Sequence, residues 1–271
     1  MRALIFSNDE RYQEIIRFFH EKGHWIDEAD EKGIQIDVSV YDIIIFPIPG
    51  ISNGFFAGST LLPPEFLNDS KEDVIIFSGI RTPCLSQMLA ESNRECIYFM
   101  EDEQVAMENA IPTVEGIIAD LVLNTKITIH DADIMVIGYG KVGKPLVLAL
   151  TKLGAHVFVG VNKEKDIEEL ELLGILGVDT KQQSMGDYVR TVDMIINTVP
   201  ALVLEESHIV NLNKEVYVLD VSSYPYGIDQ EALKFNEISY KIYPKIPSRV
   251  APKTSGKILA KKIETVMEQE L

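Results

Sequence analysis

Residues 133–161 have the sequence DIMVIGYGKVGKPLVLALTKLGAHVFVGV, and this stretch decides the fold. The short apolar run 134–137 predicts a buried strand. It leads directly into a complete G-x-G-x-x-G motif formed by Gly138, Gly140 and Gly143. An apolar helix and a second apolar strand follow. A glycine motif alone is weak evidence, but this order of strand, turn, helix and strand indicates a dinucleotide-binding unit.

Each glycine of the motif has a physical role in such a unit. Gly138 allows the tight turn, Gly140 lets the backbone approach a pyrophosphate, and Gly143 lets helix and strand pack closely. The N-terminus of the following helix offers free N–H groups and partial positive charge to the phosphates. We therefore expect the cofactor to be bound by Gly138, Tyr139, Gly140, Lys141, Val142 and Gly143.

The residues after the second strand bear on the choice between NAD and NADP. An NAD-preferring site carries Asp or Glu about 20 residues after the motif, where it binds the ribose 2′-hydroxyl. Here residues 160–163 are Gly-Val-Asn-Lys, and the first acid is Glu164. A 2′-phosphate is then not repelled, and Asn162 and Lys163 can hydrogen-bond or pair with it. The sequence therefore predicts NADP(H).

Composition describes a globular protein with an acidic surface. The 271 residues suffice for two domains, with 46% hydrophobic and 25% charged residues. The formal net charge of −17, with no basic block to offset it, argues against a nucleic-acid partner. An anionic substrate must therefore be held by local cations and helix N-termini.

Cysteine usage and hydropathy indicate the compartment. Cys84 and Cys96 have neither disulfide-framework nor metal-ligand spacing, so we expect reduced core thiols and no metal site. The N-terminal apolar stretch is too short for a signal peptide, and no run approaches the ~18 apolar residues of a membrane span. These features predict a cytoplasmic protein.

Strands that alternate with helices predict an open α/β domain in the first part of the chain. We assign residues 1–112 to this flavodoxin-like or Rossmann-like substrate domain. In such sheets, ligands bind beyond the carboxyl ends of the strands. The loops at 7–9, 47–52 and 78–81 are therefore expected to face the substrate.

Residues 113–253 are predicted to form a second, doubly wound domain, the NADP-binding Rossmann domain. It is entered through a connector helix at 113–126, with Thr113 as the expected N-cap. On the helix after the second strand, Glu169 and its acidic neighbours are expected to be solvated. The C-terminal segment 254–271 places apolar side chains on one helical face, and we expect it to pack back on the first domain.

Several segments together resemble one known family. They are IPTVEGIIADLVL (111–123), the glycine unit (134–160), RVAPKTSGKILA (249–260), FSGI (77–80) and INTVP (196–200). The combination of I-P-T-V-E-G with V-A-P-K-T-S-G is much more specific than a glycine motif. On these segments the chain resembles the A subunit of bacterial dipicolinate synthase nearly from end to end.

The resemblance implies an NADP-dependent oxidoreductase built on the two-domain plan of the 2-hydroxyacid dehydrogenases. The reaction that it implies oxidises dihydrodipicolinate, from a branch of lysine synthesis, to pyridine-2,6-dicarboxylate (dipicolinate) during sporulation. A hydride passes from the dihydropyridine ring to the nicotinamide, and loss of a proton completes aromatisation. The resemblance also implies a flavoprotein-like partner, the B subunit of dipicolinate synthase, and we expect a homo-oligomer.

The resemblance also implies positions for the site residues. The turn at 160–163 meets the adenosine ribose. The residues placed along the cofactor, near the nicotinamide ribose, are Asn197, Thr198, Val199 and Pro200. The residues placed in the cleft between the domains are Ser78, Gly79, Thr113, Glu115, Lys253 and Thr254.

A small dicarboxylate substrate needs two anion-binding groups. Lys253 and Thr254 at a helix start offer one. Ser78 with Arg81 offers the other, since Arg can bind a carboxylate through two hydrogen bonds. Glu115 could accept the ring proton, or it could equally cap its own helix, and the sequence leaves both open.

Two other functions remain open. A dehydrogenase of another small carboxylate, such as a D-2-hydroxyacid, uses a histidine paired with a carboxylate. None of the five histidines falls late in the chain, where that histidine is expected. A non-catalytic NADP-binding scaffold or redox-sensing protein would explain why no acid–base pair is evident.

Overall fold

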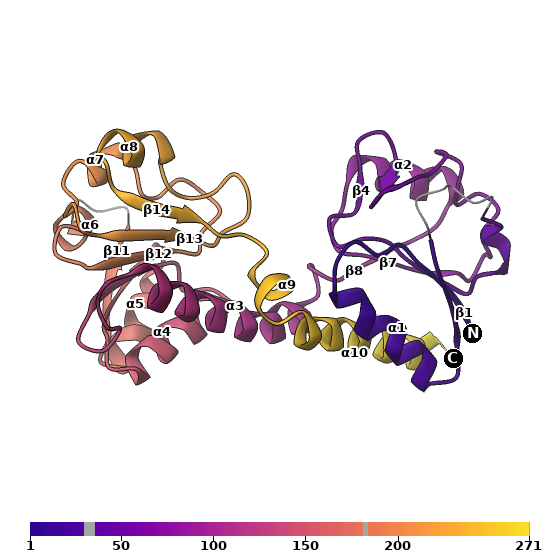
Figure 1. Ribbon diagram of the computed structural model, residues 1–271, viewed down its shortest axis with the longest axis horizontal. Helices are drawn as coiled ribbons and strands as arrows, with labels where there is room; N and C mark the ends of the chain where they lie inside the picture. Colours follow the sequence, from indigo (N-terminus) through magenta and orange to yellow (C-terminus); the bar gives the residue numbers. More distant parts are fainter. Residues whose placement is uncertain (30–35, 181–183, 271) are drawn as a thin grey trace. The chain divides into compact units, whose positions relative to one another are not determined.

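The computed structural model describes three stretches of the chain: residues 1–29, 36–180 and 184–270. They divide into two compact units, each of which contains one large sheet (Figure 1). The first unit comprises residues 1–109 and 251–271, and the second comprises residues 110–250. The division expected at 112/113 falls inside a continuous helix, described below.

The first unit is built on a parallel sheet of five strands in the order β2-β1-β3-β7-β8. These strands are β1 (Arg2–Ile5), β2 (Trp25–Glu28), β3 (Ile43–Ile45), β7 (Ile75–Ser78) and β8 (Ile97–Tyr98). The segment after β3, where we expected only a loop, forms a small antiparallel sheet of β4 (Ile51–Ser52), β5 (Phe56–Ala57) and β6 (Thr60–Leu61).

Helices cover both faces of this parallel sheet. On one face lie α1 (Arg11–Glu21) and α10 (Pro252–Glu270), and on the other lies α2 (Pro83–Ser92) (Figure 1). All three isoleucines of β3 are therefore fully buried, as is typical of a central parallel strand. The two covering helices α1 and α10 pack closely, since a Cβ added to Gly256 would lie 2.3 Å from the carbonyl oxygen of Arg11.

The helix α3 (Glu103–Asn124) corrects the connector helix expected at 113–126. It begins ten residues earlier, so Thr113 lies in its interior and is not an N-cap, and Pro112 lies inside the helix. A proline in that position costs about 3 kcal/mol or more. Packing offsets this cost, because Val105 is buried in a core of the first unit and Ile117 in a core of the second.

Polar contacts also attach α3 to the sheet of the second unit. The carboxylate of Asp120 is almost fully buried, and it accepts a hydrogen bond of 2.7 Å from the hydroxyl of Tyr217. The ammonium of Lys241 forms an ion pair with the same carboxylate. Removing one partner of such a buried group leaves the others unsatisfied, so this cluster holds the helix in one position.

The second unit is built on a parallel sheet of six strands in the order β11-β10-β9-β12-β13-β14. These strands are β9 (Asp133–Ile137), β10 (His156–Val161), β11 (Leu176–Asp179), β12 (Met194–Asn197), β13 (Tyr217–Asp220) and β14 (Ser239–Ile242). This order is that of the dinucleotide-binding Rossmann fold, whose ligands bind where the strand order reverses, between β9 and β12.

Helices again cover both faces of the sheet. On one face, α3 is joined by α4 (Gly143–Lys152) and α5 (Glu164–Leu172) (Figure 1). The other face carries α6 (Ser184–Tyr188), α7 (Glu206–Ile209) and α8 (Gln230–Phe235). A short helix, α9 (Ile246–Val250), follows β14. Both units are thus open, doubly wound α/β structures, and the predicted fold class is confirmed.

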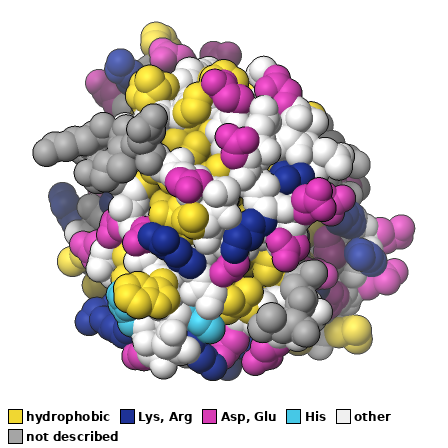
Figure 2. Space-filling model, turned by 90° about the vertical axis from the view of Figure 1, so that its right-hand side faces the viewer, with side chains coloured by type: hydrophobic (Ala, Val, Ile, Leu, Met, Phe, Trp, Pro, Cys, Tyr) yellow, Lys and Arg dark blue, Asp and Glu magenta, His cyan; other side chains and the backbone are white. Residues whose placement is uncertain are grey.

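The surface carries both signs of charge. On the face shown in Figure 2, acidic and basic side chains alternate with hydrophobic ones, and no continuous field of Lys and Arg gathers on its described part. None of the described helices combines the length and the apolar character needed to cross a bilayer.

Candidate functional site

The glycine turn connects β9 to α4 at the carboxyl edge of the second sheet. Gly138 has a φ of +102°, which L side chains rarely adopt. A Cβ at this position would also lie 2.3 Å from the hydroxyl oxygen of Thr198. That hydroxyl donates a 2.9 Å hydrogen bond to the carbonyl oxygen of Ile137. Thr198, directly after β12, therefore holds the turn in place through this hydrogen bond.

The other two glycines of the motif have different surroundings. A Cβ on Gly143 would lie 2.1 Å from the carbonyl oxygen of Gly138, so the start of α4 can approach the turn only with glycine there. A Cβ on Gly140 would meet no atom within 4 Å. No side chain caps the first turn of α4. The N-terminus of α4, with its partial positive charge, is therefore available to an anion beside Gly140.

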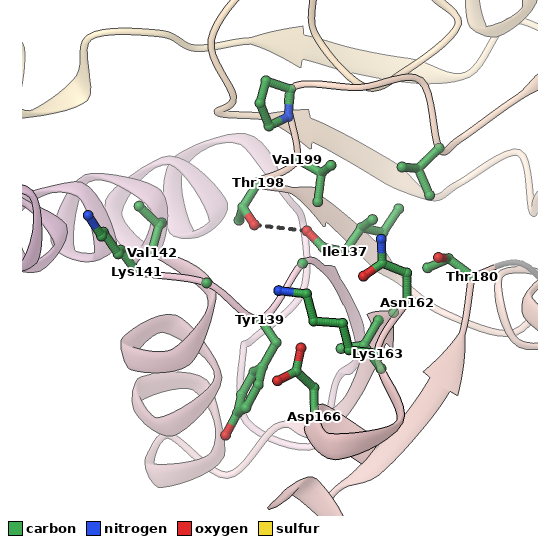
Figure 3. A pocket seen from close by; sticks show the side chains of 16 residues that line it. Ile137, Tyr139, Lys141, Val142, Asn162, Lys163, Asp166, Thr180, Thr198 and Val199 are labelled. Atoms are coloured by element: carbon green, nitrogen blue, oxygen red, sulfur yellow. Dashed lines mark hydrogen bonds between the residues drawn. The ribbon is translucent and has the colours of Figure 1, made fainter. Parts of the chain in front are cut away.

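The turn borders a cavity of about 500 Å³ (Figure 3). Ten of the twelve residues that the sequence predicted as cofactor-binding line it: Gly138, Tyr139, Gly140, Lys141, Val142, Asn162, Lys163, Thr198, Val199 and Pro200. Gly143 and Asn197 do not. Gly160 and Val161, which belong to the turn expected at the adenosine ribose, also line it. Four lining residues were missed: Ile137, Asp166, Thr180 and Val203. The cavity thus joins the ends of β9, β10 and β12, which are far apart in the sequence.

Asn197 supports the loop beside the cavity. It is fully buried, and its amide nitrogen donates to the carbonyl oxygen of Val199 at 2.9 Å. Its amide oxygen accepts from the backbone N–H of Val199 at 3.1 Å. Because the side chain is used within its own loop, Asn197 positions Val199 and does not itself reach the cavity.

A cluster of three side chains holds the glycine turn against α5. The ammonium of Lys144 lies 2.7 and 2.8 Å from the two carboxylate oxygens of Glu169 and 4.8 Å from the centre of the Tyr139 ring. The hydroxyl of Tyr139 donates to Glu169 at 3.3 Å. Glu169, expected to be solvated, is thus the acceptor of this cluster. The sequence could not indicate this because its partners lie 25 and 30 residues away.

The cluster shifts the pKa values of its members. The hydrogen bond from Lys144 holds the pKa of the Glu169 carboxyl below its usual range, and the same bond raises the pKa of Lys144. Burial raises the pKa of Tyr139, and the charge of Glu169 adds to this effect. At neutral pH the cluster therefore contains a carboxylate, an ammonium and a neutral phenol.

Polar side chains gather where β10 ends, and Figure 3 shows them together at this end of the cavity. Asn162 and Lys163 follow the strand and are exposed, and Asp166, in the first turn of α5, is half-buried. We call Asn162, Lys163 and Asp166 the β10 end of the cavity. Its two predicted members can bind a phosphate, whereas the carboxylate of Asp166 opposes one.

Two of the residues predicted to bind the substrate, Ser78 and Gly79, lie at the end of β7 in the first unit. The hydroxyl of Ser78 is fully buried and donates to the carbonyl oxygen of Ile80 at 3.3 Å. Gly79 packs against the backbone of Ile48, where a Cβ would lie 2.0 Å from the carbonyl oxygen. These contacts fix the loop after β7. The hydroxyl of Ser78 is therefore already hydrogen-bonded within the protein.

Arg81 was predicted to bind a substrate carboxylate through two hydrogen bonds, but it already binds a carboxylate of the protein in this way. Its guanidinium donates to both carboxylate oxygens of Glu101, at 2.6 and 2.9 Å, and lies 4.2 Å from the centre of the Tyr98 ring. The hydrogen bonds from Arg81 lower the pKa of Glu101, so the pair remains charged. Arg81 would have to leave Glu101 before binding another carboxylate.

The remaining predicted residues lie on two helices. Lys253 and Thr254 are exposed, and because α10 begins at Pro252, they occupy its first turn rather than preceding it. Glu115 is exposed on α3, in the second unit, whereas Thr113 is buried in the same helix. The interior position of Glu115 in α3 excludes the capping role that the sequence left open.

None of the five histidines lines the cavity at the glycine turn. Among the described residues, no group of three or more His, Cys, Asp or Glu side chains is arranged to hold a metal ion. The candidate site therefore consists of the glycine turn, the N-terminus of α4 and the β10 end of the cavity.

The segment that lines the cavity is similar to a known protein family, and the whole chain is similar to known proteins. The family described as "NADP oxidoreductase coenzyme F420-dependent" matches residues 133–224, which include β9, β10, β12 and the glycine turn. Among curated proteins, the A subunit of dipicolinate synthase of Bacillus subtilis (strain 168) is 27% identical over 288 aligned positions, covering 99% of this chain and 96% of the relative.

Solved structures agree with this relative. The crystal structure of the dipicolinate synthase A subunit from Bacillus halodurans superposes with a TM-score of 0.90 at 28% identity, covering 98% of this chain and 97% of that one. The corresponding protein from Bacillus subtilis gives a TM-score of 0.90 at 25% identity, covering 100% and 96%. D-lactate dehydrogenase from Escherichia coli, at 14% identity and a TM-score of 0.66, shares the fold over 100% and 97%.

The resemblance found in the sequence is thus confirmed in both sequence and fold over nearly the whole chain. The neighbours also confirm the two-domain plan of the 2-hydroxyacid dehydrogenases. Together, the fold and these relatives indicate a dehydrogenase-like oxidoreductase with a nicotinamide cofactor.

Proposed function

We propose that this chain, which resembles the dipicolinate synthase A subunit from end to end, oxidises dihydrodipicolinate to dipicolinate with NADP⁺. The observation that supports this most strongly is the similarity to that protein over 99% of the chain. The cavity at the glycine turn adds a site of suitable chemistry for the cofactor. The reaction would serve sporulation, on a branch of lysine synthesis, in the cytoplasm.

The geometry of the cavity supports a proposal for the residues that bind the cofactor. We propose that the uncapped first turn of α4, beside Gly140, binds the pyrophosphate. Asn162 and Lys163 would bind the 2′-phosphate, which selects NADP(H). Val199 and Pro200, on the loop that Asn197 supports, would lie beside the nicotinamide ribose.

The chemistry requires little of the protein beyond binding and proton removal. A bound NADP⁺ supplies the hydride acceptor. Besides that hydride, the dihydropyridine ring would have to lose one proton to a base to become aromatic. We propose Glu115, an exposed carboxylate, as that base. Lys253 and Thr254, in the first turn of α10, would bind a substrate carboxylate.

The partner and the assembly are also part of this proposal. The name of the relative implies a second component of the enzyme, and by analogy this chain would act with a protein of the dipicolinate synthase B type. We propose that the chain itself forms a homo-oligomer. The activity assay should therefore be performed both with and without the B-type partner.

Turnover tests the proposed function. Purified protein is mixed with NADP⁺ and freshly made dihydrodipicolinate, and NADPH and dipicolinate are followed by absorbance. Both should rise together in equal amounts. A Gly140→Ala variant, designed to retain the fold and lose the cofactor, should produce neither. If NADP⁺ binds but no turnover occurs with or without the B-type partner, the chain is a non-catalytic NADP-binding scaffold.

The same assay tests the proposed substrate-binding lysine. Lys253→Ala should raise the KM for the dicarboxylate about tenfold or more, because an ion pair to the substrate is lost. Lys257, exposed one turn further along α10, offers a matched control: Lys257→Ala removes the same charge and should leave the KM unchanged. An unchanged KM in Lys253→Ala would remove Lys253 from the site.

A further inference from the structure

The β10 end of the cavity contains a carboxylate that the proposed NADP(H) site does not require. Asp166 lines the cavity together with Asn162 and Lys163, although it lies three residues beyond the segment that usually selects the cofactor. Figure 3 shows its side chain at the same end of the cavity as Lys163 and Tyr139. A 2′-phosphate bound by Lys163 would therefore lie close to a negative charge.

The position of Asp166 in the first turn of α5 explains why it lines the cavity. Asp166 and Glu169 are three residues apart, so they share one face of the helix. Glu169 is occupied by Lys144 and Tyr139. None of the ion pairs within 4.0 Å among the described residues involves Asp166. Asp166 and Tyr139 of the glycine turn line the same cavity.

We propose that Asp166 is a specificity-determining residue for the cofactor, and that it limits the preference for NADP(H) over NAD(H). Its carboxylate opposes a 2′-phosphate and accepts a hydrogen bond from the ribose hydroxyl of NAD(H). Lys163 acts in the opposite direction. The cavity therefore binds both cofactors. This inference rests on the proposed function only in requiring a nicotinamide dinucleotide in this cavity.

The two charges act on the phosphate in opposite directions. The interaction between two charges near a protein surface falls with their separation and is weakened further by solvent. A 2′-phosphate carries more than one negative charge at neutral pH, as other phosphate monoesters do. Neutralising Asp166 should therefore favour the phosphorylated ribose by about tenfold. Specificity then arises from repulsion as well as from attraction.

The experiment measures binding of half-cofactors and does not depend on turnover. The dissociation constants of 2′,5′-ADP and 5′-ADP are determined by isothermal titration calorimetry for the full chain, Asp166→Asn and Glu164→Gln. Glu164 is an exposed acid in the same first turn of α5 that does not line the cavity, so it controls for charge on the helix. Asp166→Ser serves as a second neutral variant.

The wild-type chain should bind both probes. The affinity ratio of 2′,5′-ADP to 5′-ADP should rise about tenfold in both Asp166 variants and stay within about twofold of wild type in Glu164→Gln. An unchanged ratio in the Asp166 variants, or an equal rise in Glu164→Gln, would overturn the inference. So would failure of both probes to bind. A chain that shows the predicted ratios but no oxidation of dihydrodipicolinate would refute the proposed function and leave this inference intact.

Discussion

Gly138 and Gly140 lie two residues apart in one turn and are needed for different reasons. Gly138 has a positive φ and no room for a Cβ, because the hydroxyl of Thr198 would lie 2.3 Å away. A Cβ on Gly140 would meet no atom within 4 Å, and Gly140 lines the cavity. Gly138 is therefore needed for the fold of the turn, and Gly140 is needed for binding of the proposed cofactor.

Alanine substitutions separate these two requirements. Gly138→Ala should lower the free energy of unfolding by about 2 kcal/mol or more, through backbone strain and overpacking. Gly140→Ala should change it by no more than about 0.5 kcal/mol, but should weaken NADP⁺ binding at least about tenfold, because a Cβ would occupy the place of the pyrophosphate. Thermal unfolding and calorimetric titration measure the two effects. Undiminished binding in Gly140→Ala would place the pyrophosphate elsewhere.

At this scale, the sequence was most informative where the type of a residue reflects its backbone conformation. Most of the cofactor positions follow from glycines and strand ends, and ten of them line the cavity. Side-chain partners that are distant in the sequence could not be predicted. Asn197 was expected to contact the cofactor, but its amide bonds to its own loop. Asp166 was missed because only the fold turns the first turn of α5 towards the end of β10.

At the scale of elements, the buried central strands were predictable, whereas one edge strand of each large sheet was not. Central strands such as β3 and β9 are covered on both faces and therefore consist of continuous apolar runs. The edge strands β2 and β11 were missed, because they are short and mix polar with apolar residues. Trp25 of β2 is 77% exposed, which an apolar pattern cannot anticipate. The proline in α3 likewise suggested a helix start that tertiary packing overrides.

The contact between α4 and α5 has a predictable dependence on pH. The pKa of Glu169 is lower in the folded protein than its ordinary value of 4.5, because Lys144 hydrogen-bonds to the carboxylate. The stabilisation that the charged form provides is therefore present above about pH 4.5, and it is lost as the pH falls through the folded value. Glu169→Gln removes this titrating group.

Thermal unfolding of both proteins between pH 7 and pH 3 provides the test. The wild type should unfold at a higher temperature than Glu169→Gln at neutral pH, and the difference should close below about pH 4.5. Because the pair is exposed, the difference should shrink with added salt. A difference in unfolding temperature that stays constant down to pH 3 would show that the carboxylate contributes no charge-dependent stability.

At the scale of the whole molecule, the chain leaves the first unit at residue 109 and returns to it at residue 251. This arrangement divides the residues proposed for catalysis, since Glu115 belongs to the second unit and Lys253 to the first. A sequence can indicate such residues only through resemblance to a family. The net charge of −17 gives both units a field that a dicarboxylate must overcome locally, which is the role we propose for Lys253.

The central claim is that a hydride passes directly from a dihydrodipicolinate ring to a nicotinamide bound in the cavity of the second unit. The most direct measurement is isotopic: dihydrodipicolinate deuterated at its saturated ring carbons is oxidised with NADP⁺, and the nucleotide is examined by mass spectrometry. The account predicts one deuterium in each NADPH formed, in equal amount to dipicolinate. Dipicolinate that forms while all the deuterium appears in water, or without any reduced nucleotide, would contradict it.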